Sequence, residues 1–393
     1  MRKPFIFGCI AIFLTGSLRA STKVTVQQLS SLLSEFHQNG KSDEAEATKL
    51  KELELSEQLS IATMNSFTQY DPGPLTTTQI RILAVESALL PPPKSDLPAD
   101  AAPDTADQAA IMNRAVDYAA HRYADTPELM AEKQTIRFQN GVTKIQTNSG
   151  TYGNFSSGDP GMNAVNPYLL MLGAHTETVQ SEHGIELQPR GEKQKDPANQ
   201  NGQISQGGAG LVLGVILVDA AKGDITWLRW EMVNGKKTAV FSFSVDKKQS
   251  HYKVNYCCFP VMENIGGGGS VNRTQSMPAI MAQPGGTATN FTSFSAHPGY
   301  HGELFVDPET GTILRLITKA DLKPTDLVQQ EDIRVDYGPV EVAGKQYVVP
   351  LHSMILTQVV PNGNSFAKYS TRRTLFDIAY TNYRLDEDEP MKR

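Results

Sequence analysis

The chain has 393 residues, of which 39% are apolar and 20% charged, so it is long enough for two or three domains and can bury a core. This composition excludes a chain that is disordered throughout. The formal net charge of −6 leaves no basic excess, which argues against nucleic acid or a polyanionic membrane surface as a partner.

The first twenty residues have the pattern of an export signal. A basic head precedes an apolar run over residues 4–18, and Ala20 is a small residue suited to cleavage. The run is shorter than the ~20 residues of a spanning helix, so a retained anchor is the weaker alternative, and so is lipid attachment at Cys9. We therefore expect residues 1–20 to be a signal peptide. The mature chain is expected to be periplasmic or extracellular and not integral to the membrane.

Residues 21–90 are predicted to form a helical unit. Apolar residues recur at helical spacing in two stripes. The first stripe comprises Val26, Leu29, Leu32, Leu33 and Phe36, and the second comprises Leu50, Leu53, Leu55 and Leu59. Asp43 is suited to cap the second helix, with Ser42 as the rival cap. A turn at residues 71–74 precedes a third helix over residues 76–90.

Composition divides the rest of the chain. Residues 91–105 begin with three prolines and are rich in Pro, Ala and Asp, which predicts a linker. Residues 106–385 are expected to be one domain, a helix followed by an antiparallel sheet. Polar, Gly-rich stretches near residues 189–208 and 261–298 are expected to be mobile loops. The charged residues 386–393 are expected to be a frayed tail.

One apolar segment precedes the strands of the C-terminal half. Residues 210–221 (GLVLGVILVDAA) are apolar on nearly every side, which is typical of a buried helix, although a buried strand fits nearly as well. The segment is too short to span a membrane.

Alternating apolar and polar residues then predict antiparallel strands. An Asn234-Gly235 turn joins two of them into a hairpin. A second hairpin is predicted around residues 299–317, where Asp307 starts a turn and Gly311 takes the left-handed conformation. Cys257 and Cys258 follow another strand-like run, and the sequence leaves open whether they are bonded.

Two regions carry a resemblance to known proteins. The stretches LKELELSEQLS, HYKVNYCC, GYHGELFVDPETGTILRL and VDYGPVEVAGKQYVVPLHS resemble a group of exported bacterial proteins of unknown function. The sheet of that group is similar to the periplasmic lipoprotein carriers (Lol-type) and related lipid-binding half-barrels, and the ending FDIAYTNYRL resembles the last strand of that fold. The helical unit and the insertion at residues 261–298 are not parts of the simple carriers. The resemblance implies an α+β fold, in which a curved antiparallel half-barrel wraps around an apolar helix.

Catalytic and metal-binding patterns are weak. The sequence has no nucleophile elbow, P-loop, dinucleotide fingerprint or zinc-protease motif. His297, His301 and Glu303 are the best metal-like cluster, but Pro298 prevents the helix that their spacing needs, so His301 is interpreted as a strand residue hydrogen-bonded to the sheet. Several acidic residues between Asp321 and Asp336 are interpreted as a solvated face. We assign no catalytic residue, metal or cofactor.

Aromatic and aliphatic residues supply the candidate ligand site. Alternation puts Trp230, Phe241 and Phe243 on one face of the sheet, toward the apolar segment that contains Leu211 and Leu213. The other face is expected to carry polar residues toward solvent. A curved sheet closed over one helix leaves an apolar cavity open at one end.

The favoured function is a non-enzymatic carrier or binder of an apolar, lipid-like ligand in the cell envelope, where a protein partner is also expected. The alternative is a structural or interaction protein whose sheet has a solid core and whose helical unit docks a partner. An enzyme ranks third. A cavity that holds an acyl chain separates the first function from the second.

Overall fold

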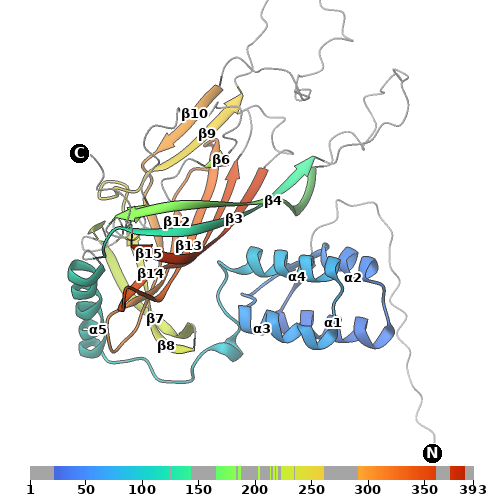
Figure 1. The fold of residues 1–393 in the computed structure, drawn as a ribbon, viewed down its shortest axis with the longest axis horizontal. Coiled ribbons are helices and arrows are strands. Elements are labelled where there is room, and N and C mark those ends of the chain that lie inside the picture. Colours follow the sequence, from blue (N-terminus) through green and yellow to red (C-terminus); the bar gives the residue numbers. More distant parts are fainter. Residues whose placement is uncertain are drawn as a thin grey trace, which may run out of the picture. The chain divides into compact units, whose positions relative to one another are not determined.

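The computed structural model describes the chain in segments, which are residues 22–123, 126–142, 165–182, 185–186, 202–203, 213, 216, 218–219, 223–233, 235–260, 291–359 and 372–385. They divide into two compact units, one up to Pro93 and one from Lys94 onward (Figure 1). The fold is mixed α+β, and its main element is a large, open antiparallel sheet, so the predicted fold class is confirmed. The expected signal peptide and tail lie outside the described residues.

The first unit combines helices with one pair of short strands. Its elements are β1 (Thr22–Val24), α1 (Val26–Asn39), α2 (Asp43–Leu50), β2 (Leu53–Leu55), α3 (Ile61–Ser66), η1 (Phe67–Tyr70) and α4 (Pro74–Ser87). β1 pairs in parallel with β2. One apolar core joins the helices, and its buried members include Leu29, Leu33, Leu50 and Phe67.

Two details of this unit differ from the sequence prediction. Ser42 caps α2, because its hydroxyl accepts a hydrogen bond from the Ala45 amide. The Asp43 carboxylate instead accepts from the amides of Leu75 and Thr76 at the start of α4, at 2.9 and 2.8 Å. The choice of Asp43 as the cap of its own helix is therefore wrong, because it caps a helix distant in the sequence.

The second apolar stripe is also only partly helical. Leu53 and Leu55 lie on β2 and are both buried in the core of the first unit. Residues two apart on a strand point to the same face, so this short strand brings both side chains to the core.

The second unit begins with helical elements. These are η2 (Lys94–Asp96), α5 (Thr105–Asp117) and a π-helical turn, η3 (Tyr118–Tyr123). Asp104 caps α5 by accepting a hydrogen bond from the Asp107 amide at 2.8 Å. Ile111 and Ala115 of α5 are buried in the core of this unit together with residues of its sheet.

The described strands include a ten-stranded sheet. In spatial order its strands are β5 (Ile185–Glu186), β4 (Val165–Glu182), β3 (Leu129–Val142), β15 (Arg372–Leu385), β14 (Lys345–Val359), β13 (Val328–Val342), β12 (Ile313–Ala320), β11 (Tyr300–Val306), β8 (Lys236–Val245) and β7 (Asp224–Val233). Every neighbouring pair is antiparallel. The last strand, β15, lies inside the sheet beside β3, so segments far apart in the sequence meet at its centre (Figure 1).

Both predicted hairpins are confirmed. β7 and β8 pair across a turn in which Gly235 has a φ of +78°. β11 and β12 pair across residues 307–312, where the Asp307 amide donates to the Thr312 carbonyl at 2.8 Å and Gly311 has a φ of +73°. Glycine tolerates these positive φ values because it lacks a Cβ.

A second sheet consists of β6 (Gly202–Gln203), β9 (Val254–Pro260) and β10 (Phe291–Ala296), with β9 in the middle. The sequence analysis expected one antiparallel sheet in residues 106–385, but the strand-like run before Cys257 lies on β9, which pairs with β10, while β8 pairs with β11. β6 and β10 fall within the two segments expected to be loops, of which residues 189–201 and 261–290 are outside the described residues.

The apolar segment at residues 210–221 is helical where the structure describes it. Leu213, Ile216, Val218 and Asp219 are in helical conformation, and Leu213 and Ile216 are buried in the core of the second unit. The helix interpretation of this segment is therefore confirmed at those residues. Among the described residues, no helix has the length and apolar character needed to cross a membrane.

The register of the main sheet determines which side chains share a face. One cross-strand row contains Phe243, Gly302, Thr318, Ile333, Ile355, Phe376 and Arg137, in order from β8 to β3. We call this side the core face, because its residues share one buried cluster with α5, with Leu213 and Ile216, and with β9. The other side, which includes Phe305, Arg315 and Asp336, is the opposite face.

Candidate functional site

The residues predicted to bind a ligand lie together on the core face. Phe241 and Phe243 are 2% and 4% exposed, and Leu213 is fully buried against the same cluster. Trp230 packs on this cluster from its edge and is partly buried. Leu211 lies outside the described residues. The structure thus brings four of the five predicted residues into one apolar cluster.

Edge-to-face ring contacts organise this cluster. The ring of Trp227 contacts those of Trp230 and Phe241, with centroids 4.9 and 5.5 Å apart, and Phe243 contacts Tyr300 at 6.0 Å. Such T-shaped pairs match the positive edge of one ring to the negative face of another. Trp230 is also fixed by a hydrogen bond from its Nε1 to the Ala101 carbonyl, at 2.8 Å. Ala101 belongs to the segment expected to be a linker.

The strand that carries both tryptophans has an irregular register. The pairing of β7 with β8 shifts between Trp227 and Arg229, so Leu228 is the extra residue of a bulge. As a result Trp227 joins Trp230 on the core face, while Leu228 is 43% exposed. Simple alternation would put Leu228 and Met232 beside Trp230. This holds for Met232, which pairs with Lys237 as Trp230 pairs with Ala239, but not for Leu228, because the bulge changes the alternation before Arg229.

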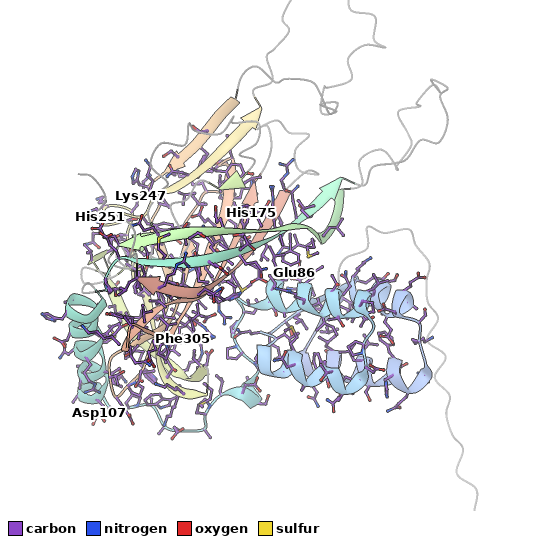
Figure 2. All side chains as sticks on the ribbon, viewed as in Figure 1. Glu86, Asp107, His175, Lys247, His251 and Phe305 are labelled. Carbon is purple, nitrogen blue, oxygen red and sulfur yellow. The ribbon has the colours of Figure 1, made fainter. Side chains whose placement is uncertain are left out.

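A buried carboxylate ties the helical segment to the sheet. Asp219 is fully buried and accepts hydrogen bonds from the Tyr300 hydroxyl at 2.9 Å and from the His251 amide at 2.7 Å. Its other oxygen contacts the His251 ring nitrogen Nδ1 at 2.5 Å. The His251 side chain is largely exposed (Figure 2). These contacts hold the end of the helical segment against β11, and we interpret Asp219 as a structural anchor.

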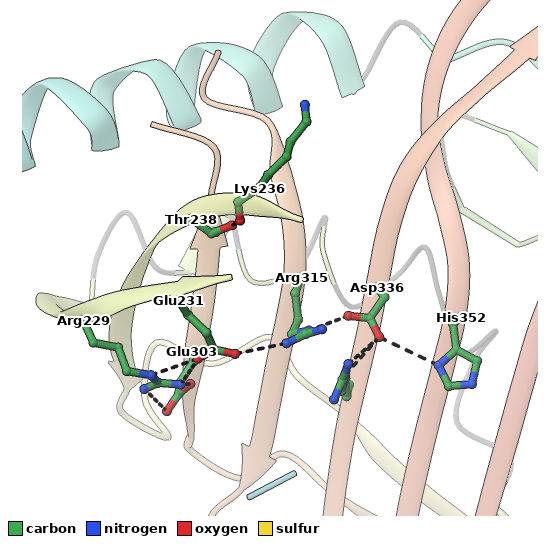
Figure 3. A network of polar contacts seen from close by, with 9 residues as sticks. Arg229, Glu231, Lys236, Thr238, Glu303, Arg315, Asp336 and His352 are labelled. Carbon is green, nitrogen blue, oxygen red and sulfur yellow. Dashed lines mark hydrogen bonds and ion pairs between the residues drawn. The ribbon is translucent and has the colours of Figure 1, made fainter. Parts of the chain in front are cut away.

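The opposite face carries a chain of charged side chains that runs from β7 to β15, and Figure 3 shows its part from Arg229 to His352. Arg229 contacts Glu231 and Glu303, both at 2.7 Å. Arg315 contacts Glu231 at 3.3 Å and continues the chain to the next strands. Cations and anions therefore alternate from β7 to β12, and each cation has a carboxylate partner.

Asp336 is the centre of this charge chain. It accepts from Arg315 at 2.5 Å and contacts Arg334 at 2.9 Å and His352 at 3.8 Å, and His352 also contacts Asp377. Burial disfavours the charged His352 ring, but its contacts with Asp336 and Asp377 outweigh burial and raise its pKa to about 9. Burial likewise acts to raise the pKa of Asp336, but Arg315 and Arg334 outweigh it and hold that pKa well below its usual value.

The acidic residues of β13 are not a solvated face. Glu331, Asp332 and Asp336 are 0%, 7% and 8% exposed, so this sequence prediction is wrong for them. Both faces of β13 are covered, Glu331 on the core face beside Tyr252 and Asp336 within the charge chain. A charged residue on such a strand is buried whichever face it occupies.

The residues of the best metal-like cluster in the sequence have different partners in the structure. The His301 ring contacts Asp321 at 2.8 Å, while Glu303 binds Arg229. Among the described residues, no group of three or more His, Cys, Asp or Glu side chains has a metal-binding arrangement. The side chains of Cys257 and Cys258 lie outside the described residues, although both residues are on β9.

Sequence reasoning missed a pair of arginines on the core face. Arg137 of β3 lies in the same row as Phe243, and Arg372 of β15 lies four residues before Phe376 on the same face. Tyr256 of β9 reaches this pair, and its hydroxyl is hydrogen-bonded to the Arg372 side chain. Arg137 alternates with the apolar Ile136 and Phe138, a pattern typical of a polar residue on a solvated face, so the sequence offers no sign that Arg137 lies half-buried on the core face.

The arrangement offers apolar contact and ionic pairing rather than covalent chemistry. Two shallow surface depressions of about 380 and 330 Å³ lie along α1 in the first unit, and their linings include none of the aromatic residues above. They are lined mainly by polar side chains such as Gln27, Ser31 and Glu35.

Comparisons with known proteins give one structural similarity. No protein-family profile and no curated protein match the chain. A search of solved structures finds the crystal structure of a domain described as an outer membrane lipoprotein-sorting protein from Vibrio parahaemolyticus. The two share 8% sequence identity over 72% of this chain and 95% of that chain, with a TM-score of 0.31. Similarity at this level assigns no function.

Proposed function

We propose that this chain is an exported, non-enzymatic binder or carrier of an apolar, lipid-like ligand, which it takes up between the core face of the main sheet and the elements packed on that face. Trp230, Phe241, Phe243 and Leu213 would contact the ligand, together with Leu211 of the same apolar segment. The binding requires no metal or cofactor, because transfer from water is driven by burial of apolar surface.

The proposal rests on one observation, which is that aromatic side chains at the border of the apolar cluster on the core face are only partly buried. Trp227, Trp230, Phe294 and Phe376 are partly buried and pack around the buried cluster. Aromatic side chains at the border of an apolar face provide contact area for a ligand that enters along the sheet. An open sheet leaves such a border, whereas a closed barrel has none.

The tight burial of two of the proposed ligand contacts favours a second candidate function, that of a structural or interaction protein with a solid core. Phe241 and Leu213 are almost fully buried without a ligand. On this hypothesis the core face is filled by the protein's own side chains, and the first unit docks a partner in the cell envelope.

The deciding experiment measures ligand content and ligand uptake together. Protein purified from an envelope fraction would be extracted with organic solvent, and the extract analysed by mass spectrometry. In parallel, a fluorescent fatty acyl probe would be titrated into the purified parent protein and into Phe243→Ala. The proposal expects a co-purified lipid and a probe signal that Phe243→Ala weakens.

Val116→Ala is the matched control, because Val116 is 56% exposed on α5 and outside the buried cluster. It should leave probe uptake unchanged. If the parent protein carries no lipid and takes up no probe, the carrier function is wrong and the structural function remains.

Export is part of the same proposal and has its own measurement. Intact-mass analysis of the protein from the envelope of its native host should find a mature chain that begins near Ser21. A full-length species embedded in the membrane would contradict this localisation.

A further inference from the structure

Among the described residues, several buried or half-buried cations of the main sheet have carboxylate partners. On the opposite face, Arg229, Arg315 and Arg334 each contact Asp or Glu within 3.3 Å. On the core face, Lys133 of β3 contacts Glu186 at 2.7 Å and Glu177 at 3.6 Å. Such pairing is expected, because an uncompensated buried charge is costly.

Arg137 and Arg372 depart from this pattern. Arg137 lies four residues after Lys133 on the same strand and face, yet within the described part of the chain neither arginine forms a salt bridge with a carboxylate. The polar partners of Arg137 there are a Gln139 amide oxygen, at 2.7 Å, and the Phe376 ring, 5.8 Å from its guanidinium carbon. Its Nε atom is buried and, among the described residues, has no hydrogen-bond partner.

The two guanidinium groups also repel each other. Burial lowers the pKa of Arg137, the nearby Arg372 lowers it further, and no carboxylate opposes these effects. Burial raises the pKa of the Tyr256 hydroxyl, which both arginines oppose. Arginine stays protonated in proteins, so two positive charges and one neutral hydroxyl converge on this part of the core face.

We infer that Arg137, Arg372 and the Tyr256 hydroxyl form a binding site for an oxyanion, the carboxylate or phosphate end of the apolar ligand. This inference rests on the proposed function, because the same ligand would lay its acyl part along the aromatic residues of the row that ends at Arg137. Guanidinium groups bind carboxylate and phosphate in bidentate geometry, and the buried Nε of Arg137 is a donor of the required kind.

The row of side chains supports this orientation of the ligand. It runs from Phe243 on β8 through Ile333, Ile355 and Phe376 to Arg137 on β3. One end of the row is therefore apolar and aromatic and the other is cationic. An amphiphile with one anionic end matches this polarity, whereas a neutral hydrocarbon leaves the two cations without an anion.

The test compares two acyl probes that differ only in the charge of their end group. A fluorescent fatty acid and its methyl ester would be titrated into the parent protein, Arg137→Gln, Arg372→Gln and the control Arg384→Gln. Arg384 is an exposed residue of the same strand as Arg372, with a contact to the Asn382 carbonyl at 3.5 Å. The parent and Arg384→Gln should bind the acid about 10- to 100-fold more tightly than the ester, the range of one charge-assisted hydrogen bond. Arg137→Gln and Arg372→Gln should each reduce the ratio of acid to ester affinity toward one and leave the affinity for the ester unchanged.

A second measurement keeps the inference testable if a glutamine variant does not fold. Tyr256→Phe retains both charges and removes one donor, so it should reduce the ratio of acid to ester affinity only partly. If the site also accepts a free anion, inorganic phosphate alone should raise the Tm of the parent protein. The acyl probes then show whether the anion must be attached to an acyl chain.

The outcomes separate this inference from the carrier function. Equal affinity of the parent for acid and ester would overturn the anion site and leave the carrier function standing. Stabilisation by phosphate without uptake of either acyl probe would support a site for a free anion and contradict the carrier function. Neither uptake nor stabilisation by phosphate would contradict both.

Discussion

Phe305 on the opposite face lies beneath the guanidinium groups of Arg229 and Arg315, whose central carbons are 5.8 and 5.1 Å from the ring centroid. Both cations also contact Glu231, which is only 3% exposed. Contacts with carboxylates and with the face of an aromatic ring therefore together offset the free-energy cost of removing the two charges from water. Single residues in this sheet have specific contact partners, so their replacement is expected to change the free energy of unfolding.

Phe241 tests whether the core face is packed. We expect Phe241→Ala to lower the free energy of unfolding by about 3–5 kcal/mol, because a buried ring that contacts Trp227 is lost and leaves a cavity. Urea denaturation of both proteins measures this loss. Val116→Ala, at an exposed position, should change stability by no more than about 0.5 kcal/mol. A much smaller loss for Phe241→Ala would indicate an open pocket at this residue.

His352 predicts a pH dependence of stability. Its pKa of about 9 in the folded protein lies above the ordinary histidine pKa of 6.5, so its stabilising contribution is complete below about pH 6.5 and is lost as the pH rises through 9. The shift corresponds to an upper limit of about 3 kcal/mol. Unfolding free energies from pH 6 to 10 for the parent and His352→Gln should therefore converge or cross as the pH rises. A difference between the two proteins that stays constant over this range would contradict a charged His352.

At the scale of elements, turns and bulges decide which faces meet. The bulge at Leu228 brings Trp227 and Trp230 to one face. In β14, Pro350 lies inside the sheet opposite Tyr337, where the register of β13 shifts, so a residue without an amide hydrogen occurs at an irregular point of the pairing. The β11–β12 turn approaches α5, and the Arg114 Nε donates to the Pro308 carbonyl at 3.0 Å.

Two features restrict the residue type at Gly311 in this turn, the backbone conformation and the contact with α5. It has a φ of +73°, and a Cβ there would lie 2.3 Å from the backbone of Arg114 on α5. Gly344 has a φ of +75° with no atom within 4 Å of such a Cβ, so it isolates the cost of the backbone conformation. We expect Gly344→Ala to cost about 1–2 kcal/mol and Gly311→Ala clearly more. Chemical denaturation of both variants gives the comparison, and equal losses would show that α5 does not restrict the turn.

At the scale of the whole molecule, the described chain forms two compact units with separate cores. The core of the first unit contains Leu29 and Phe67, and that of the second contains Phe241 and Leu304, with no residue in common. Each core has its own apolar residues, so each unit has its own source of stability.

Leu29→Ala tests this division. Leu29 is fully buried in the first unit, so the variant should lose about 2–5 kcal/mol of stability there. We expect calorimetry to show a lowered transition for the first unit, while binding of the acyl probes by the second unit is retained. Leu304→Ala is the matched change in the second core and should have the reverse effect. Loss of probe binding in Leu29→Ala would show that the second unit depends on the first.

The sequence by itself determined the local elements and the class of the fold. The Gly235 and Gly311 turns, the apolar stripe of α1 and the alternation in β8 depend on neighbouring residues, so they were readable without the structure. The set of Phe241, Phe243, Trp230 and Leu213 was also predictable, because large apolar residues in alternating or helical patterns are driven to a common core. For the same reason the α+β class and its antiparallel sheet were predicted correctly.

Only the tertiary structure decided where the charges lie. Asp336 lies on a strand that is buried on both faces, and Arg137 is half-buried on the face opposite to Ile136 and Phe138. Alternation cannot distinguish such a face from a solvated one. The pairing of β15 with β3, across more than two hundred residues, brings Arg372 to the face of Arg137. Long-range pairing depends on the whole sheet and leaves no local pattern, which is why the arginine pair and the charge chain were invisible in the sequence.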